Sequence, residues 1–499
     1  MTLLPRNNVS GLPGEPYAQP GRWLTVVGFA GLLVLLVLSL VFWKERASHS
    51  DASLVIVEMV NVGGFITPHN RFICLLYGWL PALLVKSGAS LRAVAMGYSF
   101  AYALLPLLMA LVAQFIIKSP WTTIKIVVYF TIWETLLFYY PVSDLQMGCG
   151  VLILYDALAA RFQHHVSRRR SFIWQSVLLV PLIAFAHPLC LITVGGWLCY
   201  RLPWLRQEGR RIVLWLPALL TILCAIIKAV WLTSYYEQQL REGDGLLSGL
   251  RMAMFESRLC TTTLDYLWHE GFVVLALFAL GAVLAVAQRR YWNYLVMLFF
   301  SLGLFSIVLV RYAESDQGAY QHYYEHLLRP IAALLAMATV GLVARSKARD
   351  LVLSAGLAII LTISISKILN AAGPHTMRVE WMTKLMGAME KQGIRKGMIP
   401  RSWAPNAIDK VQLWNSSKES LMLSSLDGPQ HTRTLFMYWP WMDLNDPNVP
   451  LDRSDVVLVD GGQFPQGALN PRYFGLDTSH YIQLEQIIPK DSLHRWMYP

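Results

Sequence analysis

The amino-acid sequence predicts an α-helical polytopic membrane protein, and three observations lead to this fold class. Of the 499 residues, 55% are hydrophobic and 15% are charged, whereas an ordinary soluble domain has about 25% charged residues. The hydrophobic residues gather in long runs, as a bilayer requires of its helices. The 18 Trp and 22 Tyr residues suit the membrane interfaces, where such rings settle. This composition excludes an ordinary soluble enzyme and a disordered chain.

About eleven hydrophobic runs are expected to span the membrane, since a span needs about 20 residues. The first run has no small-residue cleavage site behind it, so it predicts an anchor and not a signal peptide. A further run, 72–86, is too short to span and contains Gly78, Trp79 and Pro81, so we expect a juxtamembrane helix along the outer surface. The expected spans are 23–43, 91–117, 122–139, 145–160, 172–186, 188–202, 212–233, 270–288, 293–310, 327–345 and 350–367.

The Lys and Arg residues predict on which side of the membrane each loop lies. If 72–86 does not cross, the Arg-rich loops within 161–170, 201–211, 289–290 and 345–349 fall on the side of the N-terminal tail. Short cytoplasmic loops carry an excess of Lys and Arg, so the N-terminus is expected in the cytoplasm and the C-terminus outside. We expect a multi-pass protein of a bacterial inner or plasma membrane. The net charge of +11 then reflects topology and anionic lipids, and no nucleic-acid partner is expected.

Three parts of the chain follow from this topology. Residues 1–22 are expected as a cytoplasmic tail and 23–367 as the transmembrane domain, with an outer loop at 44–90. Residues 368–499 are polar and rich in Pro and Trp, and they predict a small α/β domain on the outer face. Its expected elements are a helix near 377–392 and strands at 434–439, 455–460 and 481–488, separated by turn residues.

Carboxylates near the outer ends of the spans are the candidates for catalysis. Asp51 and Glu58 lie in the first outer loop, and Asp144 lies at the next outer turn. A carboxylate held at a membrane mouth acts as a general base when an acceptor hydroxyl reaches it. The alternative is that Asp51 and Asp144 cap the helices beside them, because Asp is a favoured N-cap. Glu134 falls inside an expected span, where a structural partner explains a buried carboxylate better.

Basic residues near the same face are the candidates for binding a phosphate. Arg presents forked donors that match phosphate oxygens, while the alternative for these cations is anchoring in the interface. His187 precedes a proline, so turn formation is its alternative role. The candidates are Arg71, Lys228, Arg311, Arg329 and His187.

Metal and thiolate chemistry have little support in the sequence. His322 and His326 have the i, i+4 spacing of metal ligands, with Glu325 beside them, but the pattern is not one of the established metal-binding motifs. The six Cys residues contain no CxxC pair, which argues against a thiolate site. We therefore predict no metal and no cofactor.

This layout resembles the GT-C superfamily of membrane glycosyltransferases, which includes protein O-mannosyltransferases and lipid A aminoarabinose transferases. The resemblance rests on the acidic first outer loop with Asp51 and Glu58, the juxtamembrane run 72–86, and the stretch 88–92 before the next span. It also rests on Pro141 and Asp144 at the second outer turn, and on an outer C-terminal domain. The first loop lacks a clean pair of adjacent acids, and the C-terminal segment lacks a Trp-Trp-Asp motif.

The resemblance implies a glycosyltransferase with a polyprenyl-phosphate sugar as its donor. It implies transfer with inversion to a lipid, glycan or protein acceptor on the outer face, with Asp51 or Glu58 as the base and Arg71, Lys228 or Arg329 at the donor phosphate. Membrane lipids would surround the donor chain. Two alternatives belong to other classes: a noncatalytic subunit of a membrane complex, and a lipid or glycolipid transporter, which predicts polar residues at mid-depth.

Overall fold

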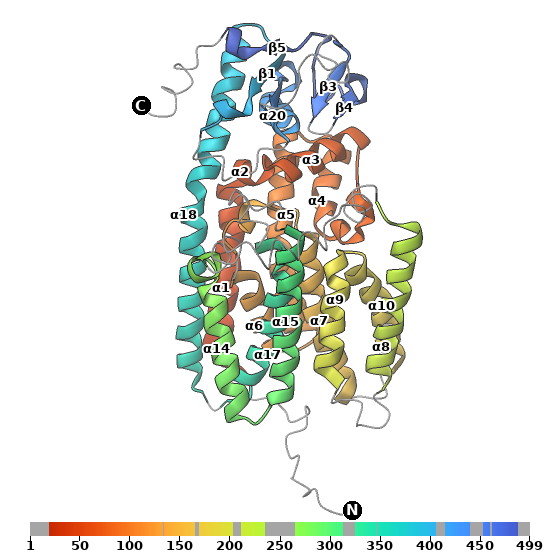
Figure 1. The fold of residues 1–499 in the computed structure, drawn as a ribbon, viewed down its shortest axis with the longest axis vertical. Coiled ribbons are helices and arrows are strands. Elements are labelled where there is room, and N and C mark those ends of the chain that lie inside the picture. Colours follow the sequence, from red (N-terminus) through yellow and green to blue (C-terminus); the bar gives the residue numbers. More distant parts are fainter. Residues whose placement is uncertain are drawn as a thin grey trace, which may run out of the picture.

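A helical bundle and a smaller C-terminal α/β region make up the structure, a computed structural model (Figure 1). Helix α18 (Asp350–Lys391) is 42 residues long and runs from the base of the bundle into the α/β region. The structure describes residues 19–132, 134–164, 169–202, 211–234, 265–312, 325–346, 348–405, 415–439, 453–459 and 462–487.

Five helices of the described residues are long and apolar enough to cross a membrane. Their outward faces expose large apolar side chains, such as Leu219, Ile222 and Val230 on α10. Apolar surface of this extent is typical of contact with lipid, which agrees with the predicted helical membrane protein. The five are α1 (Arg22–Val41), α5 (Leu91–Leu111, continued by a π-helical turn to Ile116), α7 (Asp144–His164), α10 (Ile212–Trp231) and α18.

Shorter helices complete the bundle, and buried side chains from them join one continuous apolar core. Three of them have a proline in the first turn, Pro120 in α6, Pro188 in α9 and Pro330 in α17, where the missing N–H costs no helical hydrogen bond. The shorter helices are α6 (Pro120–Thr131), α8 (Arg169–Ala184), α9 (Pro188–Arg201), α14 (Phe272–Ala287) and α17 (Arg329–Val343), and the 22-residue α15 (Tyr291–Tyr312) packs among them.

Helices α1 and α18 run side by side in the same direction. A Cβ atom built on Gly21 would meet the carboxylate of Asp350, and one built on Gly31 would meet Leu361. Both helices therefore begin at the same end of the bundle, and Figure 1 shows that the α/β region lies at the opposite end.

Three short helices lie between the bundle and the α/β region: α2 (Trp43–Ala47), α3 (Ser50–Val62) and α4 (Leu75–Lys86). Helix α4 packs along the first half of α5, because the ring of Tyr77 lies 6.0 Å from that of Tyr98 and 5.2 Å from that of Tyr102. Helices α4 and α5 therefore form a hairpin. The prediction for residues 72–86 is different, namely a helix lying flat along the outer surface.

The α/β region nevertheless contacts both ends of the segment that contains α4. Before α4, Asn61 accepts a hydrogen bond from the backbone N–H of Asn470. After α4, the carbonyl of Gly88 accepts one from Arg472. The chain therefore leaves and returns at the same end of the bundle, so residues 72–86 do not cross it.

The α/β region contains a three-stranded parallel sheet and a β-hairpin. In the sheet, β1 (Lys396–Pro400) lies between β2 (Thr434–Tyr438) and β5 (Ile482–Gln483), and β3 (Val456–Val459) pairs with β4 (Gly462–Pro465) in the hairpin. Helix α20 (Ser416–Ser424) runs back along β2, where the hydroxyls of Ser416 and Ser420 accept from the N–H groups of Met437 and Leu435.

Some of the expected C-terminal elements form and others do not. The strands expected at 434–439 and 455–460 are confirmed in β2 and β3, whereas 481–488 is a strand only at Ile482–Gln483, followed by a 3-10 turn. The expected helix at 377–392 is the upper part of α18, so no break separates it from the bundle near residue 367. Strands β1 and β4 were not predicted.

Candidate functional site

The core of the candidate site is a buried carboxylate that receives three side-chain donors from one short segment. Asp144, the first residue of α7, forms an ion pair of 3.3 Å with Arg71. The hydroxyl of Tyr77 donates to the same carboxylate at 2.8 Å, and the thiol of Cys74 does so at 3.2 Å. Asp144 is only 4% exposed. The segment between α3 and α4 is thus fixed to the start of α7.

Neither Asp144 nor Asp51 is the N-cap of the helix beside it, although the sequence allowed that role for both. At the start of α7, the hydroxyl of Ser143 accepts the hydrogen bond from the Gln146 N–H, while Asp144 is bound to side chains. In α3 the N-cap position belongs to His49, and Asp51 is the second residue of the helix. An acid in the first turn still interacts favourably with the helix dipole.

Asp51 shares its electrostatic environment with this ion pair. Partial burial raises the pKa of the Asp51 carboxyl to about 7; the negative charge of Asp144 raises it further, and the positive charge of Arg71 opposes this. All three residues therefore lie within reach of each other's charge. A partly accessible carboxylate whose pKa is close to neutrality is suited to general-base catalysis.

A group of basic side chains lies next to Arg71. His187 caps α9, where its Nδ1 accepts from the Leu189 N–H at 3.2 Å, so its expected turn role is confirmed. Burial lowers the pKa of the His187 imidazole, and the charges of Arg71, His326 and Lys228 lower it further. His187 is thus neutral at pH 7, and because Nδ1 accepts, Nε2 carries its proton.

His326 and Lys228 complete this group. The His326 ring lies edge-on to His187, with 5.7 Å between the ring centroids, and its Nδ1 lies 2.7 Å from the hydroxyl of Ser143. Lys228 is in the last turn of α10 and is 5% exposed. We call Arg71, His187, Lys228 and His326 the basic cluster; its members come from four segments that are distant in the sequence.

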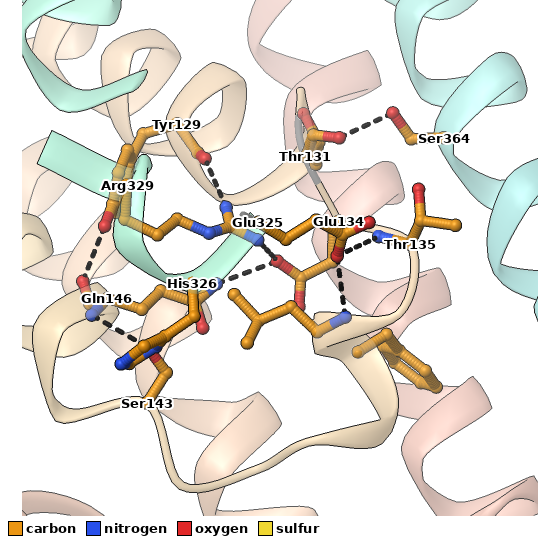
Figure 2. A network of polar contacts seen from close by, with 12 residues as sticks. Tyr129, Thr131, Glu134, Thr135, Ser143, Gln146, Glu325, His326, Arg329 and Ser364 are labelled. Atoms are coloured by element: carbon orange, nitrogen blue, oxygen red, sulfur yellow. Dashed lines mark hydrogen bonds and ion pairs between the residues drawn. The ribbon is translucent and has the colours of Figure 1, made fainter. Parts of the chain in front are cut away.

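Arg329 lies in a buried network that reaches His326 through Glu134, Gln146 and Ser143 (Figure 2). Its guanidinium forms an ion pair of 2.5 Å with Glu134 and donates to the carbonyl of Tyr129. Glu134 also accepts from the amide of Gln146 at 2.8 Å. The structural partner expected for Glu134 is therefore Arg329. The structure does not bring Arg329 into the basic cluster.

Glu325 explains why the expected span 122–139 ends early. Helix α6 stops at Thr131, and a few residues later the backbone N–H groups of Thr135, Leu136 and Leu137 donate to the Glu325 carboxylate at 3.3, 3.2 and 2.7 Å (Figure 2). A carboxylate from a distant segment thus satisfies donors that would otherwise continue the helix. The prediction of a helix through residue 139 is wrong for this reason.

The remaining predicted residues do not join Asp51 and the basic cluster among the described residues. Glu58 forms an ion pair of 3.1 Å with Lys418 of α20, and its side chain is 44% exposed. Seven residues along a helix correspond to about 10 Å, so Glu58 meets another part of the molecule than Asp51. The side chain of Arg311 and all of His322 lie outside the described residues. Among the described residues, no group of three or more His, Cys, Asp or Glu side chains is arranged to hold a metal ion.

Asp156 forms a further buried charged group, away from the candidate site. It accepts from Lys125 at 3.1 Å and from Trp197 at 2.8 Å, and it pairs with Arg201. It lies twelve residues along α7 from Asp144, about 18 Å of helix, towards the end with the Arg-rich loops. This group joins α6, α7 and α9.

Three residues near the candidate site escaped sequence analysis. Tyr77 lies in an apolar run, where an aromatic residue predicts only packing. Arg46 follows the first span and resembles an interfacial anchor, yet it is buried, donates to the Ser99 hydroxyl at 2.8 Å and lies over the ring of Phe138. His326 was considered only as a metal ligand. The one available signal for all three was a polar group close to the end of an apolar run.

No family model, no curated protein and no solved structure matches this chain. The arrangement itself supplies two chemical capabilities. Asp51 accepts a proton near pH 7, and the basic cluster attracts an anion.

Proposed function

We propose that the protein is a membrane glycosyltransferase that takes a sugar from a polyprenyl-phosphate donor. The observation that carries the proposal is that Asp51, whose pKa is about 7, and His187 of the basic cluster both lie within reach of the charge of Arg71. Sugar transfer needs a base at the acceptor and cations at the departing phosphate, and this site offers both.

In the proposed reaction Asp51 removes the proton of an acceptor hydroxyl while the acceptor oxygen attacks the anomeric carbon of the sugar. The bond between that carbon and the phosphate oxygen breaks, and polyprenyl phosphate leaves with the bonding electron pair. Attack from the face opposite the phosphate inverts the anomeric centre. Arg71 and Lys228 stabilise the charge that develops on the phosphate, and the Nε2–H of His187 supplies a neutral donor.

The proposed membrane frame has about eleven spans, with the α/β region outside the cytoplasm of a bacterial cell. The Arg-rich stretches support this frame because the described helix ends next to them lie at the end of the bundle where α1 begins, opposite the α/β region. The acceptor, a lipid, glycan or protein, is then modified on the outer face. The polyprenyl chain of the donor lies among membrane lipids beside the exposed helices.

The test uses the full-length protein in nanodiscs and measures the release of undecaprenyl phosphate. The donors are undecaprenyl-phosphate glucose, mannose, N-acetylglucosamine and aminoarabinose, with an extract of cell-envelope acceptors. We expect turnover with one of these donors, and a loss of roughly 100-fold or more for Asp51→Asn. Glu58→Gln is the matched control, because Glu58 is bound to Lys418 on the other part of α3; it keeps its turnover. Full activity of Asp51→Asn overturns the proposal.

The two alternatives predict different results in the same preparation. A noncatalytic subunit releases no undecaprenyl phosphate from any donor. A transporter moves lipid across proteoliposomes whether or not Asp51 is present. The deep residues Glu134, Glu325 and Arg329 give little support to transport, because they are bound to one another and to the backbone.

A further inference from the structure

Helix α3, which carries Asp51, is bound at both ends by the C-terminal α/β region. At its start, the side-chain amide of Asn415 donates to the carbonyl of Ser50 at 3.3 Å. At its end, the side-chain amide of Asn470 donates to the carbonyl of Val60 at 2.8 Å, and the Asn470 N–H donates to the side chain of Asn61 at 2.9 Å. The two asparagines are 55 residues apart, from 470 − 415, yet both serve the same 13-residue helix.

The contact at the end of α3 replaces a hydrogen bond that the helix itself does not supply. The last carbonyl groups of a helix lack partners within it. Here Gly63 adopts a left-handed conformation, with φ of 76°, and its N–H group turns back to the carbonyl of Met59, as helix C-termini commonly do. The neighbouring carbonyl of Val60 receives the Asn470 amide instead.

The contact at the start of α3 is buried and close to the proposed base. Asn415 is 3% exposed and Ser50 is fully buried. Ser50 directly precedes Asp51 in the chain. A shift of the Ser50 carbonyl therefore moves the carboxylate of Asp51 relative to Arg71 and Asp144.

Helix α20 is itself fixed, so Asn415 has a rigid support. Glu419 of α20 forms an ion pair of 3.2 Å with Arg378 of α18, and both side chains are fully buried. Lys418, next to Glu419 in the chain, pairs with Glu58 of α3, but the Glu58 side chain is 44% exposed, so this ion pair contributes little to holding α3. The long helix that rises from the bundle thus fixes α20, and the buried Asn415 at the start of α20 connects it to the start of α3.

We propose that Asn415 and Asn470 are positioning residues for Asp51, so that the α/β region forms part of the transfer site. This inference rests on the proposed function. A base displaced by about 1 Å loses much of its rate advantage. A loosened α3 also admits water to Asp51, whose pKa then falls from about 7 towards its ordinary value of 3.8.

The experiment combines hydrogen exchange with a pH profile on the full-length protein in nanodiscs. The variants are Asn415→Ala and Asn470→Ala, and the donor is the undecaprenyl-phosphate sugar that the wild type uses. We expect faster amide exchange across residues 50–62 and a decrease in kcat of about tenfold or more. The acidic limb of the pH profile moves to lower pH, while the KM for the donor stays unchanged, because Arg71 and Lys228 are intact.

The matched control is Arg92→Ala. This substitution breaks an exposed ion pair with Asp427 that also joins the bundle to the α/β region but does not involve α3. It leaves exchange across 50–62 and the pH profile as in the wild type. An asparagine variant that showed these effects through general unfolding would show faster exchange in β1 and β2 as well.

Two failures are distinguishable. If both asparagine variants keep wild-type exchange across 50–62 and a wild-type pH profile, the positioning role is wrong. If one variant does not fold, the other tests the same helix from its opposite end. If Asp51→Asn is fully active, the proposed function is wrong, even where exchange in α3 responds to the asparagines.

Discussion

Arg71 and Asp144 lie 73 residues apart in the chain and form an ion pair of 3.3 Å between Nη1 and Oδ2. The pair joins the segment before α4 to the first residue of α7. It is largely removed from water, and Tyr77 and Cys74 donate to the same carboxylate. Because Arg71 acts on the pKa values of both Asp51 and His187, Asp144 determines where the proposed base and the basic cluster meet.

Asp144→Asn is therefore expected to move the pH dependence of transfer. The negative charge of Asp144 raises the pKa of Asp51, and Arg71 lowers it. Burial, the largest cause of the raised pKa, is unchanged in the variant, but the charge of Asp144 no longer opposes that of Arg71, so the pKa of Asp51 falls and the acidic limb of kcat/KM moves to lower pH. The measurement is the pH–rate profile, with Asp427→Asn as the control at an exposed ion pair. A limb that stays at the same pH, or rises, contradicts the assignment of Asp51 as the titrating base.

Asp51→Asn should change how stability depends on pH. The Asp51 pKa is about 7 in the folded protein, against an ordinary value of 3.8, so the folded state binds this proton more tightly than the unfolded chain. The free energy of unfolding then decreases as the pH rises from about 4 to about 7. Asn carries no titrating charge, so the variant lacks this decrease and is more stable than the wild type at pH 8. Thermal unfolding in nanodiscs at pH 5 and pH 8 measures the difference; equal pH dependence of Tm in both proteins contradicts it.

Much of the helical bundle follows from local sequence patterns. Apolar runs of sufficient length form helices in nearly every membrane environment, because the backbone must satisfy its own hydrogen bonds there. The end of α6 was missed because the backbone just after it, at Thr135, Leu136 and Leu137, donates its N–H groups to Glu325, 188 residues beyond Leu137. No pattern between residues 122 and 139 reports that contact. Strand β1 was missed because its hydrogen-bond partners, β2 and β5, lie far along the chain.

The candidate site, like the fold, was predicted from the sequence only in part. Sequence analysis selected Asp51, Arg71 and Asp144 because ionisable groups at the ends of apolar runs are costly unless they have a role. It did not separate Asp51 from Glu58, because helical periodicity assigns both to nearly the same face of α3. Only the fold separates them, since Glu58 is paired with Lys418 of α20, whereas Asp51 lies within reach of the charges of Arg71 and Asp144.

Glu134→Gln should destabilise the protein without acting on the donor. The substitution leaves the buried charge of Arg329 without its carboxylate, and breaking a buried pair in this way costs about 3–5 kcal/mol. The double variant Glu134→Gln with Arg329→Met removes both charges and regains part of that loss. Thermal unfolding gives both values, and Glu58→Gln, at an ion pair whose carboxylate is 44% exposed, is the control. A Tm for Glu134→Gln equal to the wild type would mean that the pair contributes no stability.

Lys228→Met should weaken binding of the donor phosphate while leaving the base intact. Lys228 is 5% exposed and its charge acts on His187, and low exposure strengthens its attraction for an anion. A charge-assisted hydrogen bond contributes roughly 1.5–3 kcal/mol, so the Kd for undecaprenyl phosphate should rise roughly 10- to 100-fold. Met retains the length and apolar packing of the side chain. The acidic limb of the pH profile stays near 7, because the charge of Lys228 does not act on the pKa of Asp51.

The control for this prediction is Lys418→Met, which removes one positive charge beside Glu58, seven residues along α3 from Asp51. Lys418 is paired with Glu58 and does not belong to the basic cluster, so its loss should leave the Kd unchanged. The measurement is quenching of Trp fluorescence by undecaprenyl phosphate in nanodiscs, repeated with uncharged undecaprenol. The wild type should prefer the phosphate and Lys228→Met should lose much of that preference. If Lys228→Met and Lys418→Met bind undecaprenyl phosphate equally well, the basic cluster is not the phosphate site, because a buried cation beside a bound phosphate does not leave the affinity unchanged when it is removed.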